Sequence, residues 1–348
     1  MGLPFIRSFG LDIYVNKDAL MEIYVLSPVV GPTGGTELLQ QFCSQINKLG
    51  GNAFMMYLSD PVDKPIYNKF QPIYENPYVV GLIDKPGCCV VIPEHFAGYV
   101  SRFRQSKTAV WWMSVDNYWG AAYQADGYSY KDVYRISRRL AYKPVHLLNL
   151  SQFKKCIHFY QSEYARLYIT DKLNIDASRV YPLSDFIDLR YKADEKAVKG
   201  NTILYNPKKG IKYTKQLINS ISNYEWVPLQ GMSFSELLAT MQKAKLYVDF
   251  GAHPGKDRLP REAATCGCCV VTGMRGAAAN DVDIPISDFY KFDDFNIDQI
   301  RQTIDFVMNN YNKATLDFLE YRRSIAEELD RFQSECANAI SLFNTFNC

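Results

Sequence analysis

The chain has 348 residues, which is enough for two domains of ordinary size. Hydrophobic residues make up 47% and charged residues 22%, a balance typical of a globular protein with an apolar core. The formal net charge is +2, and no basic stripe interleaves with aromatic residues, so nucleic-acid binding is disfavoured. No apolar run reaches the roughly 18–20 residues of a membrane span, and the first residues lack the features of a signal peptide. We therefore expect a cytoplasmic protein.

Apolar segments alternate with amphipathic stretches along the first half of the chain. This pattern is typical of parallel sheets with crossover helices. Strands are predicted at 21–28, 52–58, 88–93, 108–115, 145–150 and 155–161. Helices are predicted at 36–50 and at 162–175, the second capped by Ser162. The charge-rich interval 189–201 is the predicted linker.

The alternation restarts after the linker, with strands predicted at 202–207, 225–229, 245–250 and 268–273. The sequence therefore predicts an α/β protein with two Rossmann-like parallel-sheet domains, residues 1–188 and 202–313. From Ala314 a near-heptad apolar stripe includes Phe318, Ile325 and Phe332. It predicts one long helix over 314–348 that packs back on the body, with a partner coiled coil as the alternative.

The nine cysteines include several inside apolar strands, which predicts buried, reduced thiols. Cys266 and Cys269 have C-x-x-C spacing, but no second pair completes a zinc site. The four histidines are isolated from one another. We therefore predict neither a metal nor a cofactor.

Three polar clusters follow predicted strands, where ligands of open α/β sheets bind. The first is "GPTGGTE" (31–37), a glycine-rich turn into a helix start, and it can equally be a plain turn. The second is "YNPKKG" (205–210), in which Lys208 and Lys209 precede a helix. The third, 251–262, gathers Lys256, Arg258, Arg261 and Glu262 near another helix start.

Cations at a helix N-terminus are electrostatically unfavourable unless an anion binds there. The second and third clusters therefore predict a phosphate-bearing ligand, with Glu262 accepting from a vicinal diol. Two ordinary explanations stay open. The lysine pair can be a solvated surface feature, and Arg258 with Glu262 can form an i,i+4 salt bridge.

The order of these features resembles the GT-B glycosyltransferases, in particular the large retaining family 4-like group that builds bacterial polysaccharides. Its "GGxE" is matched by Gly34, Gly35 and Glu37, and its helix-opening Ser by Ser162. The exit into its second domain is similar to "PLSDFID" (182–188). Its "KG" is matched by Lys209–Gly210, and its "PxxEAxACGxPVV" is similar to "PREAATCGCCVVTG" (260–273). The resemblance covers about residues 21–275.

Two positions depart from that family. Position 204, where an Arg is usual, is Leu, and position 254, where the first Glu of an E-x7-E pair is usual, is Pro. The first departure suggests that Lys256, Arg258 or Arg261 supplies the missing cation. The second leaves sugar recognition and the anomeric outcome open, with His253 and Asp257 as substitutes.

The resemblance implies an enzyme that moves a hexosyl or deoxyhexosyl group from a nucleotide-diphosphate sugar to a glycan or lipid-linked acceptor, without a metal. The second domain would bind the donor and the first the acceptor. The donor-binding residues we expect are Asn206, Lys208, Lys209, His253, Lys256, Arg258, Arg261 and Glu262, with Gly34 and Gly35 facing them.

An inverting enzyme also needs a base for the acceptor hydroxyl, and Glu94, His95 and Asp116 are the candidates. Tyr118 and Trp119 beside Asp116 are expected to stack on a sugar acceptor. The basic helix predicted at 133–143 is either a solvated face or a contact with the inner face of a membrane. Two other classes fit this architecture: a sugar-nucleotide epimerase or hydrolase, and a non-catalytic carbohydrate-binding protein.

Overall fold

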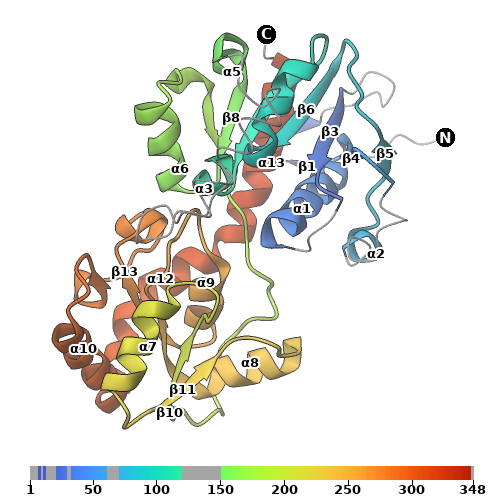
Figure 1. The fold of residues 1–348 in the computed structure, drawn as a ribbon. Helices are drawn as coiled ribbons and strands as arrows, with labels where there is room; N and C mark the ends of the chain where they lie inside the picture. Colours follow the sequence, from blue (N-terminus) through green and yellow to red (C-terminus); the bar gives the residue numbers. More distant parts are fainter. Residues whose placement is uncertain are drawn as a thin grey trace.

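Two α/β domains are stacked one on the other, and a C-terminal helix runs alongside both (Figure 1). The structure is a computed structural model that describes residues 7–8, 11–12, 21–29, 33–60, 70–119 and 150–345. The strand predicted at 145–150 and the basic helix at 133–143 lie outside the described residues, apart from Leu150, which begins a helix.

The first domain is built on a seven-stranded parallel sheet in the order β5-β4-β3-β6-β7-β8-β9. Strand β3, inside the sheet, places Val25 opposite Met55 on one side and Val91 on the other. Its strands are β3 (Glu22–Ser27), β4 (Asn52–Tyr57), β5 (Tyr78–Val80), β6 (Cys88–Pro93), β7 (Lys107–Trp112), β8 (Ile157–Tyr160) and β9 (Val180–Pro182). Their apolar runs are continuous because helices cover both faces of a parallel sheet.

The helices of this domain are α1 (Gly34–Lys48), α2 (Gln71–Tyr74), η4 (Glu94–Arg102), α3 (Val115–Trp119), α5 (Leu150–Lys155), α6 (Glu163–Leu167), η6 (Tyr168–Lys172) and η7 (Ala177–Arg179). A short antiparallel pair, β1 (Arg7–Ser8) and β2 (Leu11–Asp12), stands outside both sheets. Thr33 caps α1 and Ser162 caps α6, where its hydroxyl accepts from the Ala165 amide at 3.1 Å.

The second domain has a five-stranded parallel sheet in the order β11-β10-β12-β13-β14. Its strands are β10 (Gly200–Tyr205), β11 (Glu225–Pro228), β12 (Ala244–Asp249), β13 (Cys269–Gly273) and β14 (Lys291–Phe292). Its helices are α7 (Ile211–Ser220), α8 (Phe234–Lys243), α9 (Arg258–Thr265), η8 (Gly276–Ala279), η9 (Asp288–Tyr290), α10 (Ile297–Asn309), α11 (Tyr311–Ala314) and η10 (Thr315–Phe318).

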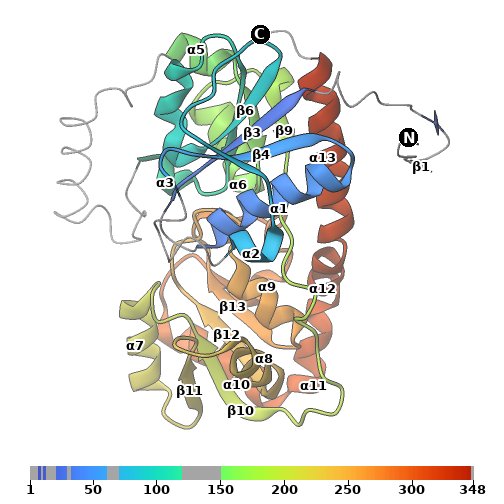
Figure 2. The ribbon, with the colours of Figure 1, turned by 90° about the vertical axis from the view of Figure 1, so that its right-hand side faces the viewer.

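The C-terminal segment returns from the second domain to the first. Tyr321 and Ile325 of α12 (Leu319–Ala326) join the second domain's core, whereas Phe332 and Phe343 of α13 (Glu328–Thr345) join the first domain's core. Figure 2 shows α12 beside the lower domain and α13 beside the upper one. A long helical C-terminal segment is confirmed, but it is not the single predicted helix, since Ala314 ends α11 and η10 covers Thr315–Phe318 before α12 begins. A turn at Glu327 divides it, and each half buries its apolar stripe in a different core.

The carboxyl ends of the two sheets face each other. The Val115 amide after β7 donates to the Pro254 carbonyl after β12 at 2.8 Å, and the Lys256 amide donates to the Gln161 side chain at 3.3 Å. A Cβ at Gly255 would lie 2.1 Å from the Met113 carbonyl oxygen, so only glycine permits this approach. The strand order reverses at β3/β6 and at β10/β12, and ligands of open α/β sheets bind outside such switch points.

The sequence predicted buried, reduced cysteines and no membrane-spanning segment. The eight cysteines within the described residues are buried and unpaired, as predicted, and burial raises the pKa of Cys266 and Cys269 to about 12. None of the helices within the described ranges combines the length and the apolar character needed to cross a bilayer.

His158 in β8 is a fully buried histidine between two hydrogen-bond partners of opposite kind. The Trp112 indole N–H donates to His158 Nδ1 at 3.1 Å, and His158 Nε2 lies 3.0 Å from the Phe153 carbonyl oxygen. Nε2 must therefore carry the proton, which makes the ring neutral. Burial lowers the pKa of His158 to about 4.

This histidine makes stability depend on pH. Between about pH 6.5 and pH 4 the unfolded chain protonates His158 and the folded chain does not, so stability falls as pH falls. We expect the free energy of unfolding to drop by on the order of 2–3 kcal/mol more in the wild type than in His158→Gln between pH 7 and pH 4.5. Urea unfolding at the two pH values measures this difference. His95→Gln, at a partly exposed histidine, should keep the wild-type drop, and equal drops in wild type and His158→Gln would contradict the assignment.

Candidate active site between the two domains

A cavity of about 260 Å³ lies where the two domains meet. The first domain contributes Asp116 from the first turn of α3 and Tyr164 from α6. The second domain contributes residues that follow β12 and β13, namely Ala252, His253, Met274, Arg275 and Gly276. The cavity therefore lies at the carboxyl ends of both sheets, one strand from the β10/β12 switch point.

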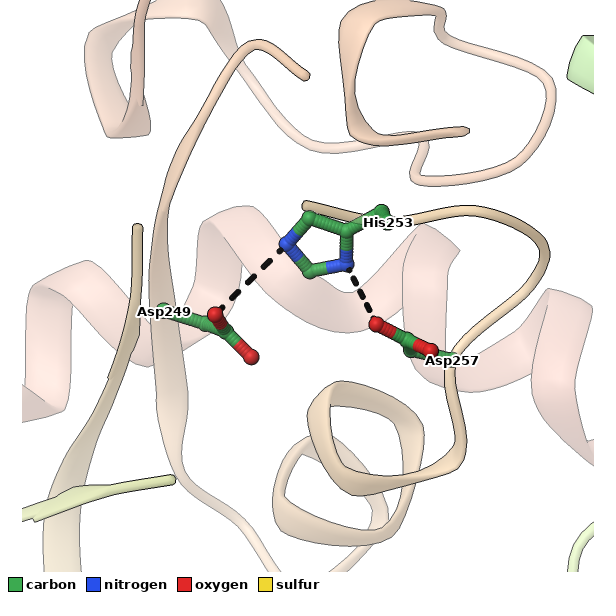
Figure 3. A group of neighbouring side chains, drawn as sticks. All are labelled: Asp249, His253 and Asp257. Atoms are coloured by element: carbon green, nitrogen blue, oxygen red, sulfur yellow. Dashed lines mark ion pairs between the residues drawn. The ribbon is translucent and has the colours of Figure 1, made fainter. Parts of the chain in front are cut away.

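A chain of charged side chains runs from the end of β12 to the start of α9, and its member His253 lines the cavity. His253 Nδ1 lies 3.1 Å from Asp257 Oδ2, and its Nε2 lies 3.8 Å from Asp249 Oδ1 (Figure 3). Asp257 also accepts from the Lys209 ammonium at 2.7 Å, and Asp249 accepts from the Tyr247 hydroxyl at 2.8 Å. This chain ties the end of β10 to the end of β12 and to the start of α9.

Groups of this chain shift one another's pKa values. Burial alone would lower the pKa of His253, but Asp249 and Asp257 raise it above its ordinary value. Burial would raise the pKa of Asp257, but Lys209 and His253 hold it at about 2. Two carboxylates thus face the His253 ring, whose protonated form they favour, and Asp257 also faces the Lys209 ammonium. The three groups Asp249, His253 and Asp257 are close enough to one another to hold a metal ion, and Asp257 also pairs with Lys209.

The first and third polar clusters meet across the domain boundary. Arg258 Nη1 lies 2.7 Å from Glu37 Oε2 of α1, and Arg258 Nε lies 3.4 Å from Glu262 Oε1. A Cβ at Gly34 would be 3.3 Å from Arg258 Cδ, so the glycine turn packs directly on this side chain. Glu262 is 6% exposed, and burial raises its pKa.

Two further residues predicted to bind phosphate, Lys256 and Arg261, also pair with carboxylates of the chain itself. Arg261 is fully buried, and its guanidinium lies 2.7 Å from both Asp185 Oδ2 and Glu328 Oε2. The Lys256 ammonium lies 2.7 Å from Glu328 Oε1 and is 10% exposed. Because Arg261 has no surface to offer a ligand, we replace its expected donor-binding role with a structural one. It joins α9 to the start of α13 and to the segment after β9.

The remaining candidates are distributed as follows. Lys208 is exposed, and Asn206 accepts from the Lys208 amide in a turn. Glu94 is buried and accepts from the Met113 amide, while His95 packs on Phe96.

The Tyr118 ring is packed among Trp112, Phe153 and Tyr168 rather than in the cavity lining. Gly35 packs near Met113. The side chain of Trp119 lies outside the described residues.

Arg275 lines the cavity but is absent from the residues expected from sequence. Its signal was present, since "MRG" directly follows β13 and puts a cation at a strand end beside a glycine. Tyr164 was also missed. Its amide and that of Glu163 donate to the buried Asp283 carboxylate at 3.0 and 2.7 Å, which fixes the start of α6 on the second domain.

The whole fold is similar to known glycosyltransferase structures. A glycosyltransferase from Rickettsia africae has a TM-score of 0.62 at 10% identity, covering 94% of this chain and 100% of that one. The lipopolysaccharide outer core galactosyltransferase WaaB has a TM-score of 0.62 at 12% identity, covering 94% and 100%. Anabaena HepE, solved with UDP and glucose, has a TM-score of 0.61 at 10% identity, covering 92% and 99%.

Such low identity establishes the fold alone. The chain has the GT-B architecture, in which two Rossmann-like domains face a cleft, and the predicted fold class is confirmed. No protein-family profile matches the sequence, and no curated protein matches it either. Membership of the retaining family 4-like group stays a prediction.

Arg261 provides a direct test of how the domains are held. Arg261→Gln leaves the buried carboxylates of Asp185 and Glu328 without their main partner, so we expect a loss of about 3–5 kcal/mol in the free energy of unfolding. The matched control is Arg323→Gln, which removes an exposed pair with Glu320 and should cost about 0–1 kcal/mol. Urea unfolding compares the two variants. Equal small losses would show that Arg261 does not carry the domain contact.

Proposed function

We propose that the protein is a glycosyltransferase that moves a sugar from a nucleotide-diphosphate donor to a hydroxyl of a glycan or lipid-linked acceptor. The observation that carries the proposal is the cavity between the two sheets. Its lining includes His253 and Arg275 of the second domain and the carboxylate of Asp116 of the first. The likeness to glycosyltransferase structures, one of them solved with UDP and glucose, supports it.

The donor diphosphate would bind at the end of β10. Lys209 stands there, and Gly210, the N-cap residue before α7, has no side chain to cap the first-turn amides. Free amides at a helix N-terminus favour an anion. Within the chain, Asp257 pairs with Lys209. A diphosphate bound here would share the Lys209 ammonium with Asp257. It would also accept hydrogen bonds from the first amides of α7, which Asp257 does not use.

The chemistry follows from charge. When the anomeric C–O bond breaks, negative charge grows on the leaving diphosphate, and preorganised donors aimed at it are each worth about 10²–10³ in rate. Lys209 and the α7 amides supply such donors without a metal, which is why we propose a metal-independent reaction. Glu262, beside Arg258, is proposed to accept from the ribose diol.

The acceptor would enter from the first domain. Asp116 lines the cavity and is 7% exposed, so we propose it as the base that removes the proton from the acceptor hydroxyl. Tyr164, rather than Tyr118, gives the cavity its aromatic surface. A role in surface polysaccharide assembly at the inner face of a membrane belongs to the same proposal and rests on the sequence of 133–143.

Binding of nucleoside diphosphates tests the donor site. We expect calorimetry against UDP, GDP and dTDP to find one tight ligand, and Lys209→Gln to weaken it about 10–100-fold, the effect of one lost hydrogen bond to a charged group. Lys215→Gln, at an exposed lysine of the same helix, should bind like the wild type. If no nucleoside diphosphate binds the wild type, the protein is instead a non-catalytic member of this architecture.

Transfer tests the acceptor half. We expect Asp116→Asn to lower the rate of sugar transfer by about 10²–10⁴ while the Kd for the nucleoside diphosphate stays unchanged, because a base acts on the proton and not on donor binding. Chromatography of products from a panel of nucleotide sugars, with and without glycan acceptors, measures the rate. Sugar release that needs no acceptor would point to an epimerase or hydrolase instead.

A further inference from the structure

Arg275 is a cation of the cavity that has no carboxylate partner within the described residues. Its Nη1 donates to the Phe250 carbonyl oxygen at 3.3 Å, and its guanidinium lies 4.4 Å from the ring centroid of Tyr213. The side chain is half-buried and lines the cavity. One carbonyl and one aromatic face satisfy only part of a guanidinium, which has five N–H donors.

Four other basic side chains near this domain boundary face carboxylates of the chain. Lys209 faces Asp257, Lys256 faces Glu328, and Arg258 faces Glu37. Arg261 also lies between two carboxylates. Asp116 lines the same cavity as Arg275, yet no ion pair joins the two. Among the residues that the structure describes, Arg275 therefore lines the cavity without a carboxylate partner. Its charge is available to an incoming ligand.

The position of Arg275 is held by two elements next to the switch point. Tyr213, on which it stacks, lies in the first turn of α7, and Phe250 directly follows β12. The contact with Tyr213 restricts where the guanidinium can lie, and the next residue, Gly276, at φ 59°, has no room for a Cβ beside the His253 carbonyl. A planar, oriented fork of N–H donors beside a helix start suits a phosphate group, which it can bind in a bidentate manner.

We infer that Arg275 binds the diphosphate of the donor and supplies the cation that the sequence lacks at position 204. Leu204 is fully buried in the core of the second domain, so that position has no access to a ligand. Arg275 reaches the cavity from the end of β13 instead, on the opposite side of β12 from β10. The inference rests on the proposed function for the identity of the donor, but the phosphate site itself does not.

Inorganic pyrophosphate is the probe, because it carries the diphosphate without nucleoside or sugar. We expect calorimetry to show that Arg275→Gln weakens pyrophosphate binding about 10–100-fold relative to the wild type. Arg275→Lys should fall between the two, since it keeps the charge and loses the planar fork. The matched control is Arg301→Gln, at another half-buried arginine of this domain, which donates to the Ser220 carbonyl.

The outcomes separate the two proposals. Equal pyrophosphate binding by wild type and Arg275→Gln, or none by the folded wild type, overturns the role of Arg275. If sugar transfer is nevertheless observed, the proposed function stands without it. Arg275-dependent binding of pyrophosphate in a protein that transfers no sugar keeps the phosphate site and overturns the proposed function. Circular dichroism of each variant confirms that a lost affinity does not come from unfolding.

Discussion

The buried guanidinium of Arg261 is the constraint on which the domain arrangement depends. A fully buried cation is tolerated only where carboxylates and hydrogen bonds surround it. Arg261 meets that requirement with Asp185 after the first sheet and Glu328 at the start of α13, and it also donates to the Lys256 carbonyl. One side chain of the second domain thereby fixes the chain's exit from the first domain and its return to it. The cavity lies between surfaces held by this contact.

The same pairing decides which cations can serve a ligand. A sequence rich in Lys and Arg near helix starts suggests many phosphate contacts, but ion pairs within the chain already use most of them. Arg258 is shared between Glu37 and Glu262, and Lys209 is held by Asp257. A ligand must therefore compete for these groups. No carboxylate competes with a ligand for Arg275. A diphosphate would therefore bind most favourably at Arg275 and at the uncapped start of α7.

The fold was predictable from sequence because its signals are local. Apolar runs such as 88–93 and 245–250 alternate with capped helices, and this alternation is typical of parallel sheets with crossover helices. Short elements such as β5 and β14 were missed, because strands of three or two residues are too short to show a periodic pattern of apolar residues.

Side-chain partners were less predictable. That Arg261 faces Asp185 and Glu328, far away in sequence, depends on how the domains pack. Asp116 and His253 were expected at the site and do line one cavity, whereas Tyr118 packs with aromatic neighbours.

The central claim is that a nucleoside diphosphate binds in the cavity at the domain boundary, with its phosphates at the second domain and the reacting sugar toward Asp116. A crystal structure of the protein with its nucleotide-sugar donor tests this most directly. The account predicts phosphate oxygens within hydrogen-bond distance of the Arg275 guanidinium and the first amides of α7, and the sugar on the side of Asp116. A nucleotide bound elsewhere, with the cavity between the sheets left empty, would contradict it.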